Sequence, residues 1–319
     1  VVHPYKAVIG HTLGAAGALE SLSALSALGA ELLPAAVGSG PIEPNLQARL
    51  LEHNTPGHPG FCLKLSSAFG GLNAALVLGN RAPRHARPRL RRAVYRRAVG
   101  RPRFELDLTR ASERFSVDEL RLARLDPLSQ LAVAACESVL ESLDTKLPAD
   151  AGIVIGSAAA TLDVNEAYHS RLRERGARAV EPRRFPPTSP NLAAGECSIL
   201  FGLHGPSFAV GASPAAALEA LIVAHDLLEA GDASALLVVA AEHVGPVASQ
   251  AFGVAGLPVP SSGALALLLE AGSAPEPSPI ERVKLSELHS KAVRAGGALA
   301  GSAPGWPSLL EAVTGLQRP

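Results

Sequence analysis

A lysine and a histidine stand close together near the start of the chain, in the stretch KAVIGHTLGAAG. Lys6 precedes His11 by five residues, and Gly10 and Gly14 leave room for a substrate to approach. A helix predicted to follow, with Thr12 as a possible cap, favours a neutral imidazole, which can donate a hydrogen bond to a developing oxyanion. The spacing alone leaves two interpretations open: a polarising donor, or an incidental histidine at a helix start.

Other residues with reactive side chains fit structural roles better. The cysteines Cys62, Cys136 and Cys197 are too widely spaced for a disulfide framework, which indicates a reducing, cytoplasmic location. Cys136 and Cys197 have apolar neighbours in predicted helices, so we expect them in the core. His53 and His58 precede Cys62 with loosely ligand-like spacing, but no fourth ligand is evident, and we predict no metal site.

Hydrophobic periodicity predicts the elements that must position these residues. In the first 80 residues it predicts a helix over Leu13–Leu32, with leucines at 19, 22, 25 and 28 on one face, and two strands around a Gly70–Gly71 turn. Further along, short apolar strands alternate with helices, which indicates an α/β fold with a mixed sheet. The helices are predicted at 127–143, 190–201 (capped by Asn191 or Ser189) and 215–230, and the strands at 61–65, 74–78, 152–155, 207–210, 235–241 and 264–270. After residue 272 the pattern weakens.

The charges are distributed unevenly. The chain has 29 basic and 29 acidic residues, but residues 81–103 hold ten arginines and no acid, so the remainder has 19 basic against 29 acidic residues. We expect a solvated linker over 81–103 that could meet an acidic partner. It lacks interleaved aromatic residues, so nucleic-acid binding is not expected. No apolar run reaches about 18 residues, so no membrane span is expected.

Two motifs of the first segment resemble one known family. KAVIGHTLGAAG, residues 6–17, resembles the lysine–histidine motif of β-ketoacyl synthases, and SSAFGGLN, residues 66–73, resembles their Gly-rich turn in the same order and at a matching separation. Thiolases share a related stretch but end with a reactive cysteine in that turn, where this chain has Phe69. The resemblance implies a thiolase-like α/β fold, with mixed five-stranded sheets layered with helices.

The second segment resembles the N-terminal half of the same family. The matching stretches are FPPTSPNLAA at 185–194, the GPS turn at 205–207, the helix–turn–strand region 220–242 and the strand at 263–270. The family carries out a decarboxylative Claisen condensation on acyl chains held by the phosphopantetheine of acyl carrier protein, with no other cofactor. By this resemblance His11 is one of two polarising histidines and Lys6 supports their hydrogen-bond network. Phe69 and Asn73 fall beside the acyl pocket, and Ser67 replaces a gating phenylalanine.

The nucleophile position departs from the family pattern. Counting nine residues on from Gly205, or seventeen back from Gly231, leads to Pro214. The family needs a cysteine there, at a helix N-terminus where the thiolate is favoured. Proline cannot form a thioester, and the neighbouring Ser213 has no base close in sequence. The family's first histidine would lie before Val1.

We therefore expect residues 1–80 to be the C-terminal part of a ketosynthase, 81–103 a linker, and 104–319 an N-terminal ketosynthase-like domain without its nucleophile, cut at both ends. Two functions remain open: a piece of a β-ketoacyl synthase that elongates fatty-acid or polyketide chains, or a non-catalytic partner resembling a chain length factor, which shapes the acyl tunnel. Acyl carrier protein and a ketosynthase-family dimer partner are the expected partners. A third possibility is that both segments form one permuted domain.

Overall fold

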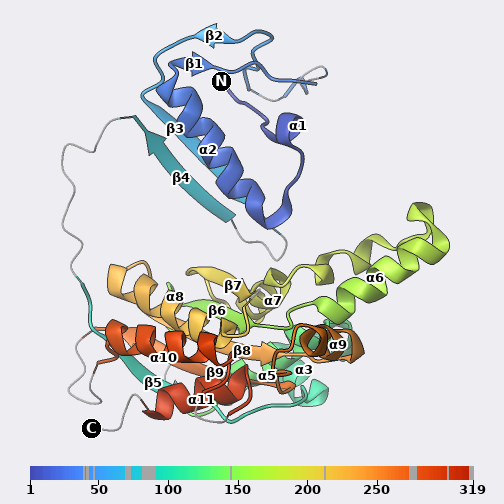
Figure 1. Cartoon of the computed structure of the whole chain (residues 1–319), viewed down its shortest axis with the longest axis vertical. Coiled ribbons are helices and arrows are strands. Elements are labelled where there is room, and N and C mark those ends of the chain that lie inside the picture. The colour runs from blue at the N-terminus through green and yellow to red at the C-terminus, as the bar shows by residue number, and fades with distance from the viewer. Residues whose placement is uncertain are drawn as a thin grey trace. The chain divides into compact units, whose positions relative to one another are not determined.

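The computed structural model of the chain forms two compact units, Val1–Pro88 and Arg89–Pro319 (Figure 1). The residues that the structure describes are 1–38, 40, 43–45, 47–68, 73–80, 91–143, 146–211, 213–272, 279–299 and 302–315. Phe69, the Gly70–Gly71 turn and residues 81–90 of the predicted linker lie outside them.

Unit 1 is built from one long helix and a β-hairpin. Its elements are α1 (Lys6–Ile9), the 3-10 turn η1 (Leu13–Ala15), α2 (Ala16–Gly29), β1 (Leu32–Leu33), β2 (Thr55–Pro56), β3 (Phe61–Ser67) and β4 (Asn73–Gly79). β3 and β4 pair antiparallel, from Phe61 opposite Gly79 to Ser67 opposite Asn73, and α2 packs against them. The predicted helix and both strands are confirmed, although the first helical turn is a 3-10 turn.

The buried face of α2 differs from the predicted leucine stripe. Ala16, Glu20, Ala24 and Leu28 are buried and recur every four residues, so they lie on one side of the helix. Leu19, Leu22 and Leu25 are 40%, 63% and 43% exposed. The leucine repeat thus predicted the helix correctly, but of its four leucines the helix buries Leu28 alone. The two alanines of the buried face, Ala16 and Ala24, let the helix approach its neighbours closely.

Unit 2 contains a mixed five-stranded sheet in the order β5-β9-β8-β6-β7. The strands are β5 (Val94–Val99), β6 (Gly152–Ser157), β7 (Ser207–Gly211), β8 (Ala235–Glu242) and β9 (Gly263–Ala271). β6 runs parallel to β7 and β8, and β9 runs antiparallel to β5 and β8. This arrangement confirms the predicted α/β fold with a mixed sheet.

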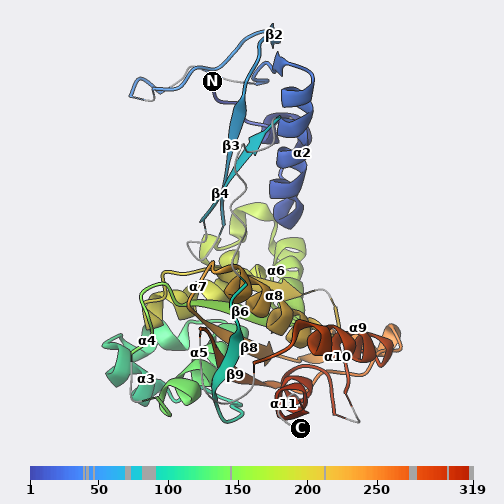
Figure 2. The same ribbon diagram turned by 90° about the vertical axis from the view of Figure 1, so that its left-hand side faces the viewer.

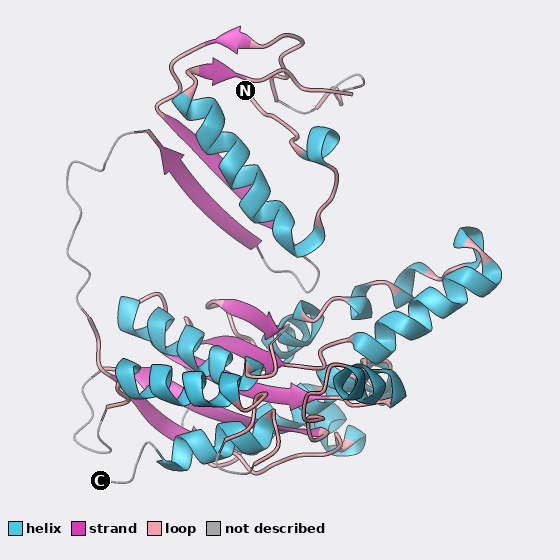
Figure 3. Ribbon diagram, viewed as in Figure 1, coloured by secondary structure: helices cyan, strands magenta, loops and turns pink. Residues whose placement is uncertain are grey.

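Helices cover both faces of this sheet (Figures 2 and 3). The helices are α3 (Leu108–Phe115), α4 (Glu119–Ala123), α5 (Pro127–Leu140), α6 (Leu162–Arg175), α7 (Asn191–Phe201), α8 (Ala216–Ala230), α9 (Pro246–Val254), α10 (Arg282–Arg294) and α11 (Trp306–Gly315). Alternate strand residues point to opposite faces. Ile155 and Leu237 join α5 and α7 in one core cluster, whereas Val154 and Leu236 join α8 and α11 in another. The strands are thus buried on both sides, which explains their continuous apolar sequences.

The linker prediction needs correction at its C-terminal end. Residues Val94–Val99 form β5, an edge strand paired with β9, rather than a solvated connector. Val94 is 1% exposed, and the Arg96 guanidinium donates a hydrogen bond to the Val313 carbonyl at 3.3 Å. Arginines fit an edge strand because its outer side and free edge can leave their charged heads in water. The unit boundary accordingly falls at Pro88 rather than at Phe104.

Helix ends and weakly patterned regions account for the other differences. α7 has Pro190 at its N-cap, and no side chain caps it, because Ser189 Oγ instead donates to Asn191 Oδ1. The predicted cap by Asn191 or Ser189 is therefore wrong. The helices α1, α3, α4, α6, α9, α10 and α11 were not predicted, and the last two lie where the apolar pattern weakens.

Candidate active site

A buried glutamate organises the charged residues of unit 1. Glu20 on α2 is 6% exposed, and its two carboxylate oxygens receive Lys6 Nζ at 2.8 Å and Lys64 Nζ at 2.7 Å. Burial alone would raise the pKa of Glu20, but hydrogen bonds and charge from the two lysines outweigh it and lower that pKa. Lys64 on β3 also donates to the Leu65 carbonyl and to Ser66 Oγ. The glutamate therefore holds Lys6 in place as an ammonium.

His11 lies outside this charged cluster. Its ring is exposed, and the Leu13 N–H donates to its Nδ1 at 3.2 Å. A neutral imidazole in this arrangement carries its proton on Nε2, which leaves an N–H donor facing outward. The predicted cap by Thr12 is wrong, because its hydroxyl makes no cap hydrogen bond. In the part of unit 1 that the structure describes, no hydrogen bond joins Lys6 to His11.

The residues predicted beside the acyl pocket are partly described. Asn73 begins β4, and its Oδ1 accepts a hydrogen bond from Ser67 Oγ at 2.7 Å, so the two side chains meet at the end of the hairpin where the chain passes from β3 to β4. A cavity of about 610 Å³ in unit 1 is lined by Lys6, Glu20 and Lys64 together with apolar residues of α2 and β3.

Pro214 lies in unit 2 at a second cavity, of about 560 Å³. Its walls are mostly apolar or small side chains, with few polar groups; they come from residues 158–162, Asn165, Thr188, Pro190, Ala209, Gly211, Ser213, Pro214, Phe252 and Leu257. We call this cavity the Pro214 pocket. Pro214 precedes Ala215, the N-cap of α8, so it stands at the helix start where a nucleophile was expected.

The backbone around Pro214 is tightly packed and offers no replacement nucleophile. Ser213 Oγ accepts a hydrogen bond from the Ala215 N–H at 3.1 Å, which is a turn-stabilising contact. Among the described residues, no histidine, lysine or carboxylate contacts this hydroxyl. A Cβ on Gly297 would lie 2.1 Å from the Pro214 carbonyl oxygen, so only glycine fits there. Neither Pro214 nor Ser213 therefore provides an activated nucleophile at this wall of the pocket.

A buried carboxylate supports the floor of the Pro214 pocket. Glu242 at the end of β8 is fully buried and accepts hydrogen bonds from Ser157 Oγ and from the Ala158 and Ala159 N–H groups at 2.6–3.0 Å. Burial raises the pKa of Glu242 to about 7, although these three donors act in the opposite direction. Glu242 thus fixes the backbone of two residues that line the pocket.

The cysteines and the loop histidines do not form reactive sites. Cys136 and Cys197 are fully buried, and their mutual hydrogen bond and burial raise the pKa of the Cys197 thiol well above its usual range. The prediction that they pack in the core is confirmed. In unit 1, His58 Nδ1 lies 3.1 Å from a Glu31 carboxylate oxygen. No three of the described His, Cys, Asp and Glu residues are grouped to hold a metal ion.

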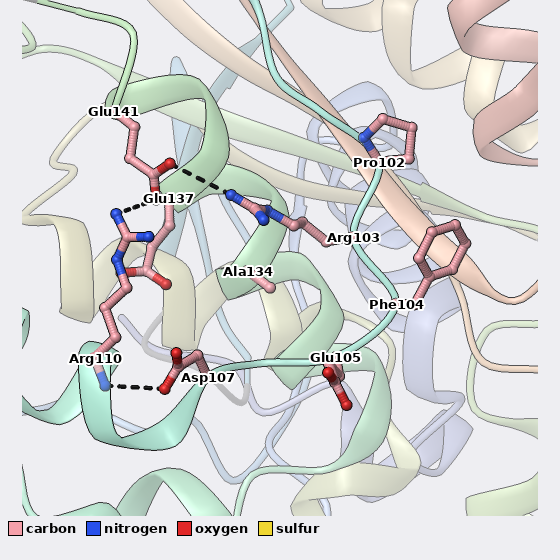
Figure 4. A pocket seen from close by; sticks show the side chains of 9 residues that line it. All are labelled: Pro102, Arg103, Phe104, Glu105, Asp107, Arg110, Ala134, Glu137 and Glu141. Atoms are coloured by element: carbon pink, nitrogen blue, oxygen red, sulfur yellow. Dashed lines mark hydrogen bonds and ion pairs between the residues drawn. The ribbon is translucent and has the colours of Figure 1, made fainter.

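A third hollow, of about 340 Å³, is lined mainly by charged residues (Figure 4). Glu141 on α5 pairs with Arg110 at 2.6 Å and with Arg103 at 3.3 Å. Glu137, one turn earlier, is 4% exposed, and burial raises its pKa although Arg114 lies 3.9 Å away. The charged residues around this hollow form an ion-pair network. The network joins α3 and α5 to the segment that follows β5.

Comparison with known proteins decides the family. The family model for the N-terminal domain of β-ketoacyl synthases matches residues 104–266, about half of the chain and all within unit 2. The chain belongs to the β-ketoacyl synthase family. No helix among the described residues is long and apolar enough to cross a membrane.

Curated relatives of the family match part of unit 2. The 3-oxoacyl-[acyl-carrier-protein] synthase 2 of Vibrio harveyi is 34% identical over 137 residues, which cover 41% of this chain and 33% of that protein. The synthase of the same name from Staphylococcus aureus is 26% identical over 125 residues, covering 38% of this chain and 31% of the relative. The chain thus spans about a third of the length of these relatives.

One solved structure resembles nearly the whole chain in fold. A protein described as PfaC Keto synthase-Chain length factor aligns with a TM-score of 0.59 and 14% identity, covering 99% of this chain and 47% of that one. At this identity the likeness concerns the fold alone, and it supports the thiolase-like α/β architecture of the β-ketoacyl synthases. The roles of Lys6, His11, Asn73 and Pro214 stay predictions.

Sequence reasoning missed several residues that the structure places in these sites. Glu20 and Lys64 form the charged cluster with Lys6, and Glu242 supports the Pro214 pocket. Glu20 had a detectable signal, because a lone acid on an otherwise small, apolar helix face requires a basic partner.

Proposed function

We propose that this chain takes part in β-ketoacyl chain elongation, with unit 2 serving as a chain-length-factor-like partner that shapes an acyl pocket without its own nucleophile. The observation that carries this proposal is Pro214, which stands at the wall of a mostly apolar pocket and at the start of α8. An apolar cavity with few polar groups suits an acyl chain. The family has its nucleophilic cysteine at the start of this helix. Proline at that position has no thiol and cannot accept the acyl chain covalently.

Unit 1 is proposed to supply synthase-type residues to the parent protein. Lys6, held as an ammonium by Glu20, and the outward Nε2 donor of His11 are suited to stabilising an enolate or oxyanion on a malonyl thioester. We infer that such groups act only together with a cysteine nucleophile and a second histidine. The alternative function, a complete β-ketoacyl synthase activity, would therefore need a cysteine nucleophile and a second histidine in addition to these residues.

The proposed partners follow from exposed apolar side chains of unit 2 and from the arginine-rich sequence of residues 81–103. β7 is an edge strand of the sheet, and Phe208 on it and Ile199 on α7 are 45% and 62% exposed, which suits association with a ketosynthase-family subunit. An acidic carrier protein, bearing the acyl chain on phosphopantetheine as the sole prosthetic group, is proposed to meet the arginines of residues 81–103. Carrier binding that is insensitive to salt would argue against that contact. We place this chemistry in the cytoplasm, in keeping with the free cysteines.

A cysteine placed at position 214 tests the pocket directly. In P214C, the new thiol at the start of α8 should attack an octanoyl thioester of N-acetylcysteamine, forming an enzyme thioester and releasing N-acetylcysteamine, as detected by intact-protein mass spectrometry. The wild-type chain should gain no octanoyl mass. L120C, a cysteine on the exposed α4 surface, is the control for non-specific acylation and should react at least about tenfold more slowly.

Two outcomes would contradict the proposal. Failure of P214C to acylate above the rate of L120C would show that the Pro214 pocket does not accept acyl chains. Release of carbon dioxide from malonyl carrier protein by the wild-type chain would show that these residues turn over without the missing groups.

A further inference from the structure

Asp163 in the first turn of α6 acts as a remote cap for α9. Its carboxylate accepts hydrogen bonds from three N–H groups at the start of α9: Gly245 at 3.0 Å, Val247 at 2.9 Å and Ala248 at 3.2 Å. The residue between them, Pro246, has no N–H to offer. The orphan donors of this helix start are therefore satisfied by a side chain more than eighty residues earlier in the chain.

The two helices joined by Asp163 pack against each other, and both contribute residues to the Pro214 pocket. Leu162 and Asn165, which flank Asp163 on α6, line the pocket, and so does Phe252 on α9. Phe252 also packs with Ala159 and Ala248 in a small buried cluster beneath the pocket. A shift of α9 relative to α6 would therefore move Phe252 against the α6 wall and change the pocket's width.

Gly245 leaves the space that the Asp163 carboxylate needs to reach the start of α9. A Cβ added to Gly245 would lie 2.4 Å from Asp163 Oδ1. Gly245 has φ −92°, which any residue can adopt, so glycine is needed there for close approach and not for its conformational freedom. Asp163 and Gly245 thus form one matched contact between α6 and α9.

We propose that Asp163 is a specificity-determining positioning residue, whose carboxylate holds α9 against α6 and so sets the length of acyl chain that the Pro214 pocket accepts. This proposal rests on the proposed function in one respect, namely that the occupant of the pocket is an acyl chain.

The test compares acyl-chain selectivity in matched variants of the full chain. Binding of S-acyl pantetheines with 4, 8 and 12 carbons is measured by isothermal titration calorimetry for wild type, D163A, G245A and D118A. Asp118 caps α4, away from the Pro214 pocket, so D118A removes a comparable cap without touching a pocket wall. We expect D163A and G245A each to change the ratio of Kd values between the best and worst chain lengths at least fivefold. D118A should keep that ratio within twofold of wild type, even though its Tm falls.

A second readout follows the contact itself. Hydrogen exchange of the Val247 and Ala248 amides should become at least tenfold faster in D163A and should not change in D118A. An unaltered chain-length ratio in both D163A and G245A overturns the proposal. If wild type binds none of the three pantetheines, both the proposed function and this proposal are overturned. Faster α9 exchange in D163A would then leave only a structural contact between the helices.

Discussion

Unit 1 and unit 2 differ in what they bury. In unit 1 the described core consists of a few small or branched residues around a Glu20–Lys64 ion pair, and the outer face of the hairpin leaves Phe61, Leu63 and Leu65 61–71% exposed. In unit 2 the sheet is buried on both faces and the pocket at Pro214 is mostly apolar. Both units thus contain a cavity, but the unit 1 cavity includes the Glu20–Lys64 ion pair in its wall, whereas the Pro214 pocket lies in a unit with a much larger apolar core.

The comparison shows why charged side chains and the walls of an acyl pocket need different surroundings. An ammonium such as Lys6 must keep access to water or to a carboxylate partner, so it belongs near a surface. An acyl pocket must exclude water, so it belongs beside a large apolar core. The variants below alter one side of this comparison at a time, beginning with the largest expected effect.

The largest expected effect is a difference in stability loss between core truncation in the unit 2 sheet and truncation on the unit 1 hairpin. L237A removes a fully buried side chain from the centre of β8 and should lower the free energy of unfolding of unit 2 by about 3 to 4 kcal/mol, because a cavity is left in a close-packed core. L63A, on the exposed hairpin face, should change the stability of unit 1 by less than about 0.5 kcal/mol. Native-state hydrogen exchange reports each unit separately. Equal losses in the two variants would remove the contrast.

The ion pair in unit 1 should have the next largest effect. E20Q leaves Lys64, whose side chain is 11% exposed, without a counter-charge, and we expect a loss of about 2 to 3 kcal/mol in the protection of the β3 and β4 amides. E31Q is the matched control, because the Glu31–His58 pair is exposed and should contribute below about 1 kcal/mol. A loss in E20Q no greater than in E31Q would refute the structural role of Glu20.

The smallest effect is the pH dependence of unit 2. Burial raises the pKa of Glu242 to about 7 in the folded chain, above that of an unfolded glutamate. The folded state therefore binds this proton more tightly, and stability is highest at low pH and falls as the pH rises through about 7. Between pH 5 and pH 8 we expect a loss on the order of 2 kcal/mol from this group.

Urea unfolding at both pH values, followed through amides of β8, measures the Glu242 contribution. E242Q cannot ionise, so its unit 2 stability should lose this component of the pH dependence. A wild-type profile that rises between pH 5 and pH 8 and is unchanged in E242Q would contradict the assignment.

The sequence predicted the central elements well because their signals are local. Strands buried on both faces have continuous apolar runs, and α5 follows Asp126 and Pro127, which mark a helix start. β5 was missed because the ten arginines of residues 81–103 made the whole segment resemble a solvated linker. Within β5, Val94 is the buried apolar residue. The leucine repeat predicted α2 but not its buried side, because periodicity identifies an apolar face and not the face that a partner covers.

The sequence identified candidate site residues that stand at a fixed spacing from a local motif. It did not identify contacts between residues that are far apart in the sequence. Pro214 stands out because its neighbours form recognisable turns. The contact between Asp163 and Gly245 leaves no trace in local sequence, since the two residues are brought together only by the fold. Lys64 was overlooked for the same reason, because its partner Glu20 lies on a different element.

The two edge strands of the unit 2 sheet, β5 and β7, carry different side chains. The β5 edge carries Arg96 and Arg97, whose like charges repel a second copy of the same edge. At the β7 edge the exposed Phe208 offers no such repulsion. Addition of a second copy at the β5 edge is therefore disfavoured by charge, whereas the strand at the opposite edge has no charged residue of its own.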